Sequence, residues 1–110
     1  MISLLAAASI LIADPAQATL SPADAFDLSC AESTRWLTAH APNEADSLRA
    51  FALSAFFLGR LSGRNPDVDW RQRFDSDAKS LPNDVAWHTK IASECLPLLR
   101  SMIPLPPNSN

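Results

Sequence analysis

Apolar residues recur every three or four positions along most of this chain, which is the spacing of an amphipathic α-helix. The densest apolar stretch is 51–63, FALSAFFLGRLSG. Its apolar face is so wide that neighbours must cover it on two sides, so we expect a central helix from Asn43 to about Ser62. Within it, Gly59 should lie at a close crossing of helices. Gly63 should adopt the left-handed conformation just past the helix end.

Start and stop signals predict the other helices. A serine followed by a proline opens the stretch 21–40, which ends before the next proline. An asparagine followed by a proline at 65–66 repeats the signal and predicts a third, shorter helix. A clean apolar stripe predicts a last helix over 85–102, with Pro97 kinking or splitting it. No stretch alternates as a strand does, so the expected fold class is all-α.

The two ends of the chain differ in character from the middle. The apolar run 4–13 is too short to span a bilayer, and a small-x-small motif at 16–18 follows it. We therefore expect a signal peptide over 1–18 and export to the periplasm or secretion, with no integral membrane segment after cleavage. The alternative is a buried N-terminal helix, which an Asp-Pro step would end early. A single helical domain of four to five helices over 19–103 and a disordered tail over 104–110 complete the prediction.

Two cysteines, Cys30 and Cys95, are present, and no C-x-x-C motif occurs. In an oxidising compartment such a pair indicates one disulfide. Closing so long a loop contributes about 4 kcal/mol in the chain-entropy treatment. We therefore predict a Cys30–Cys95 disulfide that joins the first and last helices.

The charge balance excludes one class of partner. Nine Lys and Arg stand against twelve Asp and Glu, for a net charge of −3, which argues against nucleic acid. No nucleophile motif or glycine-rich loop is visible, so an enzyme is disfavoured. His40 and His88 fall on different helices without companions at ligand spacing. Asn65, Asp67 and Asp69 alternate as at the start of a calcium loop, but the glycine and the glutamate of such a loop are missing, so no metal and no cofactor is expected.

Two other groups of residues allow more than one interpretation. Four arginines could clamp an anion, but acids are interleaved with them, which favours a solvated face of ion pairs. Of the three tryptophans, two or three should be in the core, and one at the surface would indicate a contact site. The arginines are Arg60, Arg64, Arg71 and Arg73, and the tryptophans are Trp36, Trp70 and Trp87.

The arrangement of these features resembles a known family. Cys30 lies in the first helix, the central helix ends in FLGRLSG at 57–63, an Asn-Pro-Asp turn follows at 65–67, and Cys95 precedes a Pro-Leu-Leu run. Over most of 21–102 this resembles the HdeA/HdeB-like periplasmic proteins. The resemblance implies a small all-helical fold, a periplasmic location and one disulfide. It also implies an acid-stress chaperone that forms a homodimer when inactive.

These features lead to two functional hypotheses. The first is an exported chaperone-like protein that binds unfolded clients through Phe51, Phe56, Phe57 and Trp70 once acid loosens the helices and the disulfide holds the chain together. The second is a structural or accessory protein that docks on one specific protein partner. The chain is arginine-rich, with only two lysines. This departure from the lysine-rich chaperones leaves the second hypothesis open.

Overall fold

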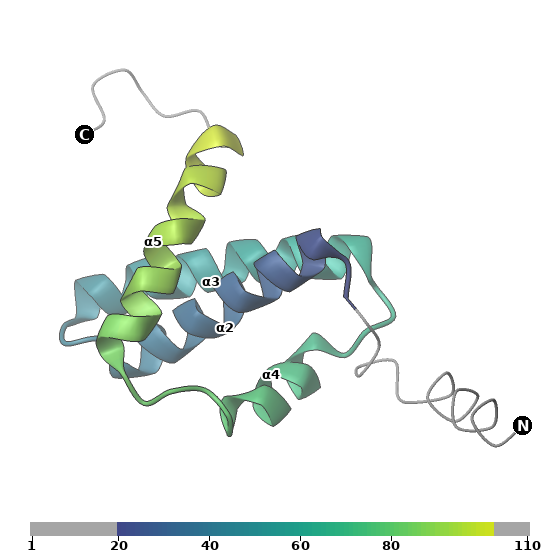
Figure 1. Ribbon diagram of the computed structural model, residues 1–110. Coiled ribbons are helices and arrows are strands. Elements are labelled where there is room, and N and C mark those ends of the chain that lie inside the picture. The colour runs from purple at the N-terminus through teal and green to yellow at the C-terminus, as the bar shows by residue number, and fades with distance from the viewer. Residues whose placement is uncertain (1–19, 103–110) are drawn as a thin grey trace, which may run out of the picture.

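Four α-helices follow one another along residues 20–102, the part of the chain that this computed structural model describes (Figure 1). They are α2 (Pro22–His40), α3 (Glu44–Arg64), α4 (Trp70–Ala78) and α5 (Val85–Met102). No strand occurs among the described residues, so the all-α prediction is confirmed. The predicted signal peptide over 1–18 and the predicted tail over 104–110 lie outside these residues.

Polar side chains accept hydrogen bonds from the first turn of each helix, where backbone N–H groups lack helical partners. The Ser21 hydroxyl accepts from the Asp24 N–H at 3.1 Å, and the Asn43 side chain accepts from the Asp46 N–H at 2.9 Å. Asp84 accepts from the Ala86 N–H at 2.9 Å ahead of α5. The predicted starts of these three helices are confirmed.

The predicted start of α4 is wrong. Asn65 and Pro66 lie in the connection before it, and Asp69 caps the helix by accepting from the Gln72 N–H at 3.0 Å. The Asn65 amide instead donates back to the Leu61 carbonyl at 3.3 Å and across to Asp24 at 3.1 Å. Because Asn65 closes the end of α3, its cap-like pattern does not open the next helix.

The central helix is α2 and not α3, which corrects the prediction from the apolar pattern. Figure 1 shows α2 and α3 as an antiparallel pair, with α5 crossing α2 and α4 beside it. Helix α2 packs against all three others and buries eight residues, whereas α3 buries only Ala50, Phe57 and Leu61. Five of the buried residues on α2 are polar, namely Asp24, Asp27, Glu32, Ser33 and Thr34, so hydropathy underrates its central place.

The core joins apolar side chains from every helix around the disulfide. Cys30 on α2 and Cys95 on α5 are bonded, with their Cα atoms 6.0 Å apart, which confirms the predicted pairing. The buried cluster consists of Leu28, Cys30, Ala31, Phe57, Leu61, Trp70, Phe74 and Cys95. The disulfide therefore ties α5 to the helix that the other elements also contact.

The glycine predictions are both wrong. Gly59 is exposed, and a Cβ built on it would meet no atom within 4 Å, so no helix crosses α3 there. Gly63 lies inside α3 and has no positive φ. Pro97 also does not split its helix: α5 runs through it, although Pro97 has no N–H to donate to the carbonyl one turn earlier.

Candidate functional site

The outward side of α3 exposes apolar side chains with few charges among them. Leu48 and Phe51 are each 60% exposed, and Ala52 and Ala55 follow at helical spacing and are also exposed. No charged residue occurs from 50 to 59. We call Leu48, Phe51, Ala52 and Ala55 the α3 face. Exposed apolar side chains without charges between them are typical of contact surfaces.

A groove of about 530 Å³ borders this face where α2, α3 and α4 meet. Its residues are Arg35, Thr38, Ala39, Phe51, Ser54, Leu58, Arg71, Phe74 and Asp75. Arg35 and Asp75 form an ion pair of 2.7 Å across it, and the Arg35 guanidinium lies 5.6 Å from the centre of the Phe74 ring. The groove thus has an apolar floor and a charged edge, and Phe51 belongs both to it and to the α3 face.

The four aromatic residues predicted as a binding surface do not lie together at the surface. Phe51 is exposed and Phe56 is partly buried, whereas Phe57 is fully buried and Trp70 is 4% exposed. Phe57 meets Phe56 edge to face with ring centres 5.0 Å apart. The Trp70 indole donates to the Asn65 carbonyl at 3.3 Å. In the folded protein only Phe51 of the four offers most of its side chain to a partner.

A second pocket, of about 240 Å³, lies between α2 and α4 and has mainly apolar walls. Its lining consists of Glu32, Arg35, Trp36, Ala39, His40, Phe74, Ala78 and Leu81. We call it the Glu32 pocket. Glu32 is 8% exposed, and its Oε2 has no hydrogen-bond partner within the described part of the chain. A buried carboxyl in an apolar wall is unusual, because burying a polar atom without a partner is costly.

Burial raises the pKa of Glu32 to about 9, and the neighbouring Asp77 carboxylate adds to the rise. Burial alone would also raise the pKa of Asp77. Hydrogen bonds with Glu32 and Arg73 outweigh that effect, so the pKa of Asp77 lies below its ordinary value. Arg73 holds Asp77 at 2.8 Å. At neutral pH Glu32 is therefore protonated and gives its hydrogen bond to an ionised Asp77.

Sequence reasoning missed Glu32 as a site residue. The available signal was its position, since Glu32 follows the buried Leu28 by one helical turn and neighbours the buried Ala31. A glutamate on the apolar stripe of a central helix would have been singled out. The density of apolar residues instead predicts the central helix over 43–62, so it does not single out residues of α2.

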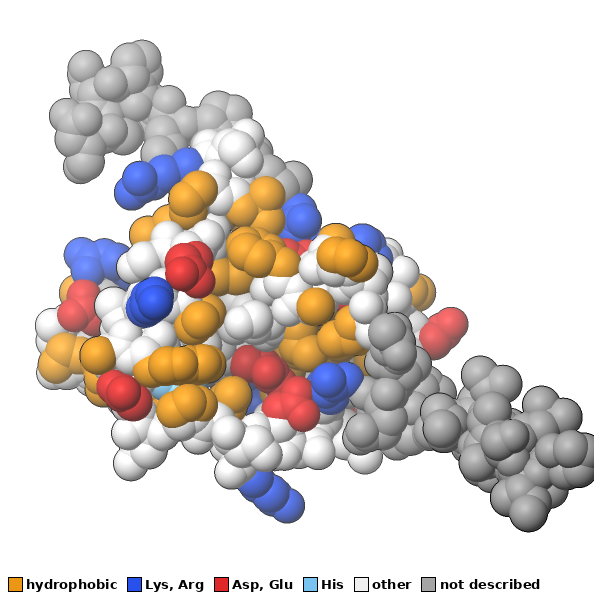
Figure 2. Space-filling model, in the orientation of Figure 1, with side chains coloured by type: hydrophobic (Ala, Val, Ile, Leu, Met, Phe, Trp, Pro, Cys, Tyr) orange, Lys and Arg blue, Asp and Glu red, His pale blue; other side chains and the backbone are white. Residues whose placement is uncertain are grey.

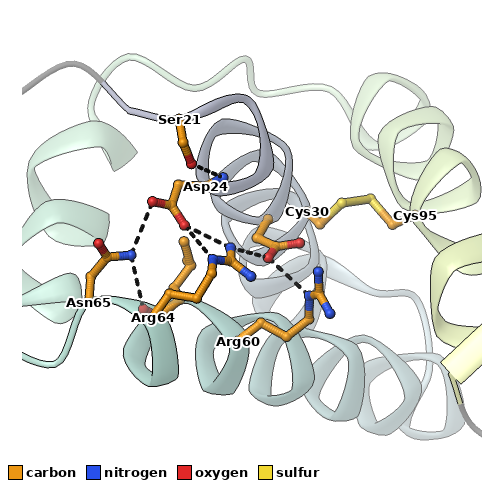
Figure 3. A network of polar contacts seen from close by, with 9 residues as sticks. Ser21, Asp24, Cys30, Arg60, Arg64, Asn65 and Cys95 are labelled. Atoms are coloured by element: carbon orange, nitrogen blue, oxygen red, sulfur yellow. Dashed lines mark hydrogen bonds and ion pairs between the residues drawn. A yellow bond between two sulfur atoms is a disulfide. The ribbon is translucent and has the colours of Figure 1, made fainter.

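Ion pairs between α2 and α3 account for two of the four clustered arginines (Figure 3). Arg60 donates to Asp27 at 3.0 Å, and Arg64 contacts both Asp27 and Asp24. Asp27 is fully buried, so these two arginines reach a carboxylate inside the protein. Burial alone would raise the pKa of Asp24, but hydrogen bonds from Arg64 and Asn65 outweigh it and lower that pKa.

Arg73 pairs with the interleaved Asp77, as the predicted face of ion pairs requires, but Arg60 and Arg64 do not follow that prediction. The signal for their true partners was the matching spacing: Asp24 and Asp27 share one side of α2, and the two arginines share one side of α3. Because their charges are used in holding α2 to α3, they do not form an anion clamp.

The two histidines contact tryptophan. Trp36 stacks between them, with ring centres 3.8 Å from His40 and 4.2 Å from His88. His88 is fully buried, and its ring nitrogens contact the Ser33 hydroxyl at 3.1 Å and the Pro82 carbonyl at 2.7 Å. Within residues 20–102 no group of three His, Cys, Asp or Glu side chains is placed to hold a metal ion.

Trp70 is buried, whereas Trp87 is 41% exposed near the start of α5. By its exposure Trp87 is the tryptophan that would indicate a contact site. Figure 2 shows hydrophobic side chains interspersed with acidic and basic ones over α5 and the middle of the molecule. Trp87 lies on α5 and not on α3, so the experiments below compare it with the α3 face as a competing contact position.

Comparisons of the chain with protein-family models, with curated proteins and with solved structures found no match. The resemblance drawn from the cysteines and the glycine helix therefore stays an expectation. None of the described helices is both long enough and apolar enough to cross a membrane.

Proposed function

We propose that this protein is exported and binds other polypeptides through the α3 face, acting in acid stress as a chaperone-like protein. The observation that carries the proposal is the 60% exposure of both Leu48 and Phe51 on a helix without charge from 50 to 59. Large exposed apolar side chains are costly in water unless a partner covers them for part of the time. The role proposed is binding and not catalysis.

The surroundings of the α3 face support a polypeptide as the partner. Phe51 connects the face to the groove, which offers Leu58 and Phe74 as further apolar contacts. Charged pairs stand at the edge: Arg35 with Asp75, and Arg49 with Asp46, both at 2.7 Å. An apolar centre with a polar rim is the usual anatomy of a protein interface. The Cys30–Cys95 disulfide is compatible with an oxidising compartment and so with export.

Acid supplies the proposed trigger. Asp24 holds α3 to α2 only while it is ionised, because a protonated carboxyl no longer forms an ion pair with Arg64. The pKa of Asp24 is lowered, so its contribution to stability is present above its ordinary value and is lost as pH falls through the folded value. Loosening should therefore begin only in strong acid. It would add the buried Phe57 and Trp70, and the half-buried Phe56, to the exposed Phe51.

The test is protection of an acid-sensitive client from aggregation between pH 7 and pH 2. The native protein should protect below about pH 3, where ordinary carboxylates are protonated. The double variant Leu48→Ser/Phe51→Ser should lose most of this protection. The matched control, Phe26→Ser/Val85→Ser, removes two side chains that are 40% and 46% exposed outside the α3 face and should keep it. Equal loss in both variants would contradict the proposal.

The second candidate is a docking protein with one specific partner. It is favoured by the small size of the α3 face, where only Leu48 and Phe51 are large and exposed. A docking protein would protect no client at any pH, yet would capture one partner from an extract of the exported proteins at neutral pH. Capture that fails with Leu48→Ser/Phe51→Ser, together with no client protection, would establish this candidate in place of the first.

A further inference from the structure

We propose that the groove where α2, α3 and α4 meet binds a small carboxylate with an apolar body. The carboxylate is held by Arg71 together with Arg35, and the apolar body lies over the side chains that form the floor. The inference concerns a small molecule and is independent of polypeptide binding by the α3 face. It rests on the size and floor of the groove, on an arginine without a partner among residues 20–102, and on the excess of positive charge in the lining.

The groove has the size and the floor for such a molecule. Its volume is about 530 Å³, within the range of about 300–1,000 Å³ that is usual for small-molecule sites. A cavity of about 150 Å³ is enough for benzene, so the groove has room for an aromatic ring and a short chain. Phe51 and Leu58 of α3 and Phe74 of α4 supply large apolar side chains to the floor. Burial of an apolar body against them supplies affinity without regard to charge.

Arg71 supplies a positive charge that the described fold does not use. It lines the groove near the start of α4 and is exposed. Its side chain forms no ion pair and no hydrogen bond with any residue of 20–102. Arg60, Arg64 and Arg73 all bind acids within this part of the chain, so Arg71 is the member of the arginine cluster that remains available to an anion there. Its guanidinium has five N–H groups in a planar fork that matches the two oxygens of a carboxylate.

Arg35 places a second guanidinium beside the floor. It lies 5.6 Å from the centre of the Phe74 ring and donates a hydrogen bond to Asp75 at 2.7 Å. That bond uses one of its five N–H groups, so others can donate to a ligand. A cation and an apolar surface therefore lie next to each other, as a molecule with a carboxylate at one end and a ring at the other requires.

The charges of the lining favour an anion. Arg35 and Arg71 carry two positive charges against the one negative charge of Asp75, which leaves an excess of one. The two hydroxyls of the lining already donate to backbone carbonyls of α2, Thr38 at 2.9 Å and Ser54 at 3.2 Å. The whole chain has a net charge of −3, so its overall field repels anions. A preference for an anion would therefore arise from a local site such as this groove.

Hydrocinnamate and hydrocinnamamide test the proposal, because they share a phenyl ring on a short chain and only the first is charged at neutral pH. Their binding is measured by titrating ¹⁵N-labelled protein and following amide chemical shifts. We expect hydrocinnamate to shift amides of 35–39 and 71–75, with a dissociation constant in the millimolar range. It should bind about fivefold more tightly than hydrocinnamamide, as an exposed ion pair provides. Propionate, which lacks the ring, should bind much more weakly.

Two variants at exposed positions assign the two halves of the ligand. Arg71→Gln should lower the affinity for hydrocinnamate about fivefold, to that of hydrocinnamamide. Phe51→Ser should weaken the binding of both molecules by a similar factor and keep the preference. The control Arg100→Gln removes the same charge from an exposed position of α5 and should bind as the native protein does. Arg71→Gln leaves the α3 face unchanged, so its effect on ligand binding is independent of client protection.

The proposal is overturned if the native protein binds hydrocinnamate and hydrocinnamamide equally, or if hydrocinnamate shifts no amide around the groove even at tens of millimolar. It is also overturned if Arg71→Gln keeps the full preference for hydrocinnamate. A loss of preference in Arg100→Gln as large as that in Arg71→Gln would overturn it too, because the preference would then follow the total charge and not the groove.

Discussion

Asp27 and Glu32 are both carboxyls buried on α2, and their surroundings compensate for burial in different ways. Asp27 is fully buried and contacts two arginines of α3. Glu32 forms no ion pair within the described residues, and burial keeps it protonated, with a pKa of about 9. One carboxyl thus stabilises the fold as an ion, and the other is tolerated as a neutral acid. Their substitutions should therefore have opposite effects at neutral pH.

Glu32→Gln should stabilise the protein at pH 7 to 8 and change little at pH 4. In the unfolded chain Glu32 is ionised above its ordinary pKa of 4.5, whereas in the fold it stays protonated up to about 9. Folding therefore takes up a proton between these values. The stability that this raised pKa supplies is complete below pH 4.5 and is lost by about 1.4 kcal/mol per pH unit as pH rises.

Denaturant unfolding at pH 4, 6 and 8 measures this slope. In the native protein Asp77, Arg73 and Arg35 are the charged groups that act on Glu32, and glutamine leaves all three in place. The slope above pH 4.5 should flatten in Glu32→Gln and persist in Glu94→Gln. If Glu32→Gln lowers stability equally at all three pH values, Glu32 is not protonated in the fold.

Asp27→Ala should destabilise the protein by about 3 kcal/mol, because Arg60 and Arg64 lose the buried partner they share. The matched control is Asp75→Ala, which breaks an ion pair whose side chains are 62% and 43% exposed. That loss should be below about 1 kcal/mol. Urea unfolding at pH 7 compares the two. Similar small losses would show that Asp27 does not hold α3 to α2.

Among the helices, the sequence predicts where each begins and ends better than how they pack against one another. The helices over Pro22–His40 and Glu44–Arg64 could be predicted closely, because caps and prolines act within a few residues. The central place of α2 could not, since it depends on the pairing of Asp24 and Asp27 with arginines more than thirty residues away. The Glu32 pocket depends likewise on how α4 returns to α2, which local signals do not encode.

Gly59→Ala should stabilise α3 by about 0.5–1 kcal/mol, because alanine has the higher helix propensity and its Cβ would meet no atom within 4 Å. The sequence pattern predicted the opposite, a glycine required by a helix crossing. Thermal unfolding measures the difference. A fall in melting temperature would mean that another backbone does approach Gly59. The control is Ala55→Gly on the same exposed side of α3, which should lose a similar amount.

At the scale of the molecule, opposing pH effects set a window for the proposed activity. Lowering pH from 9 to 5 adds stability through Glu32, and lowering it further removes stability as Asp24 and Asp77, whose pKa values are lowered, become protonated. Stability should therefore peak in mild acid. Binding of a fluorescent dye to apolar surface should rise only in strong acid. Dye binding that rises already at pH 5 would contradict this window.

The disulfide should limit how far the chain expands in acid. Cys30→Ser/Cys95→Ser should lose about 4 kcal/mol at pH 7, since a loop of 65 residues is no longer closed. Denaturant unfolding at pH 7 measures this loss, and gel filtration at pH 2 compares the sizes of the two proteins. At pH 2 this variant should expand fully and give no client protection, while the native protein keeps α5 tied to α2. Client protection that persists in the variant would show that the activity does not depend on the disulfide.

Photo-cross-linking identifies the surface that holds polypeptides, which we expect to be the α3 face. A benzoylphenylalanine is placed at position 51 on the α3 face or at position 87, where Trp87 is an exposed aromatic of α5. Each protein is irradiated with an unfolded client at pH 7 and at pH 2. We expect client adducts at position 51 in strong acid and several-fold fewer at position 87. Equal yields at both positions, or a higher yield at 87, would contradict it.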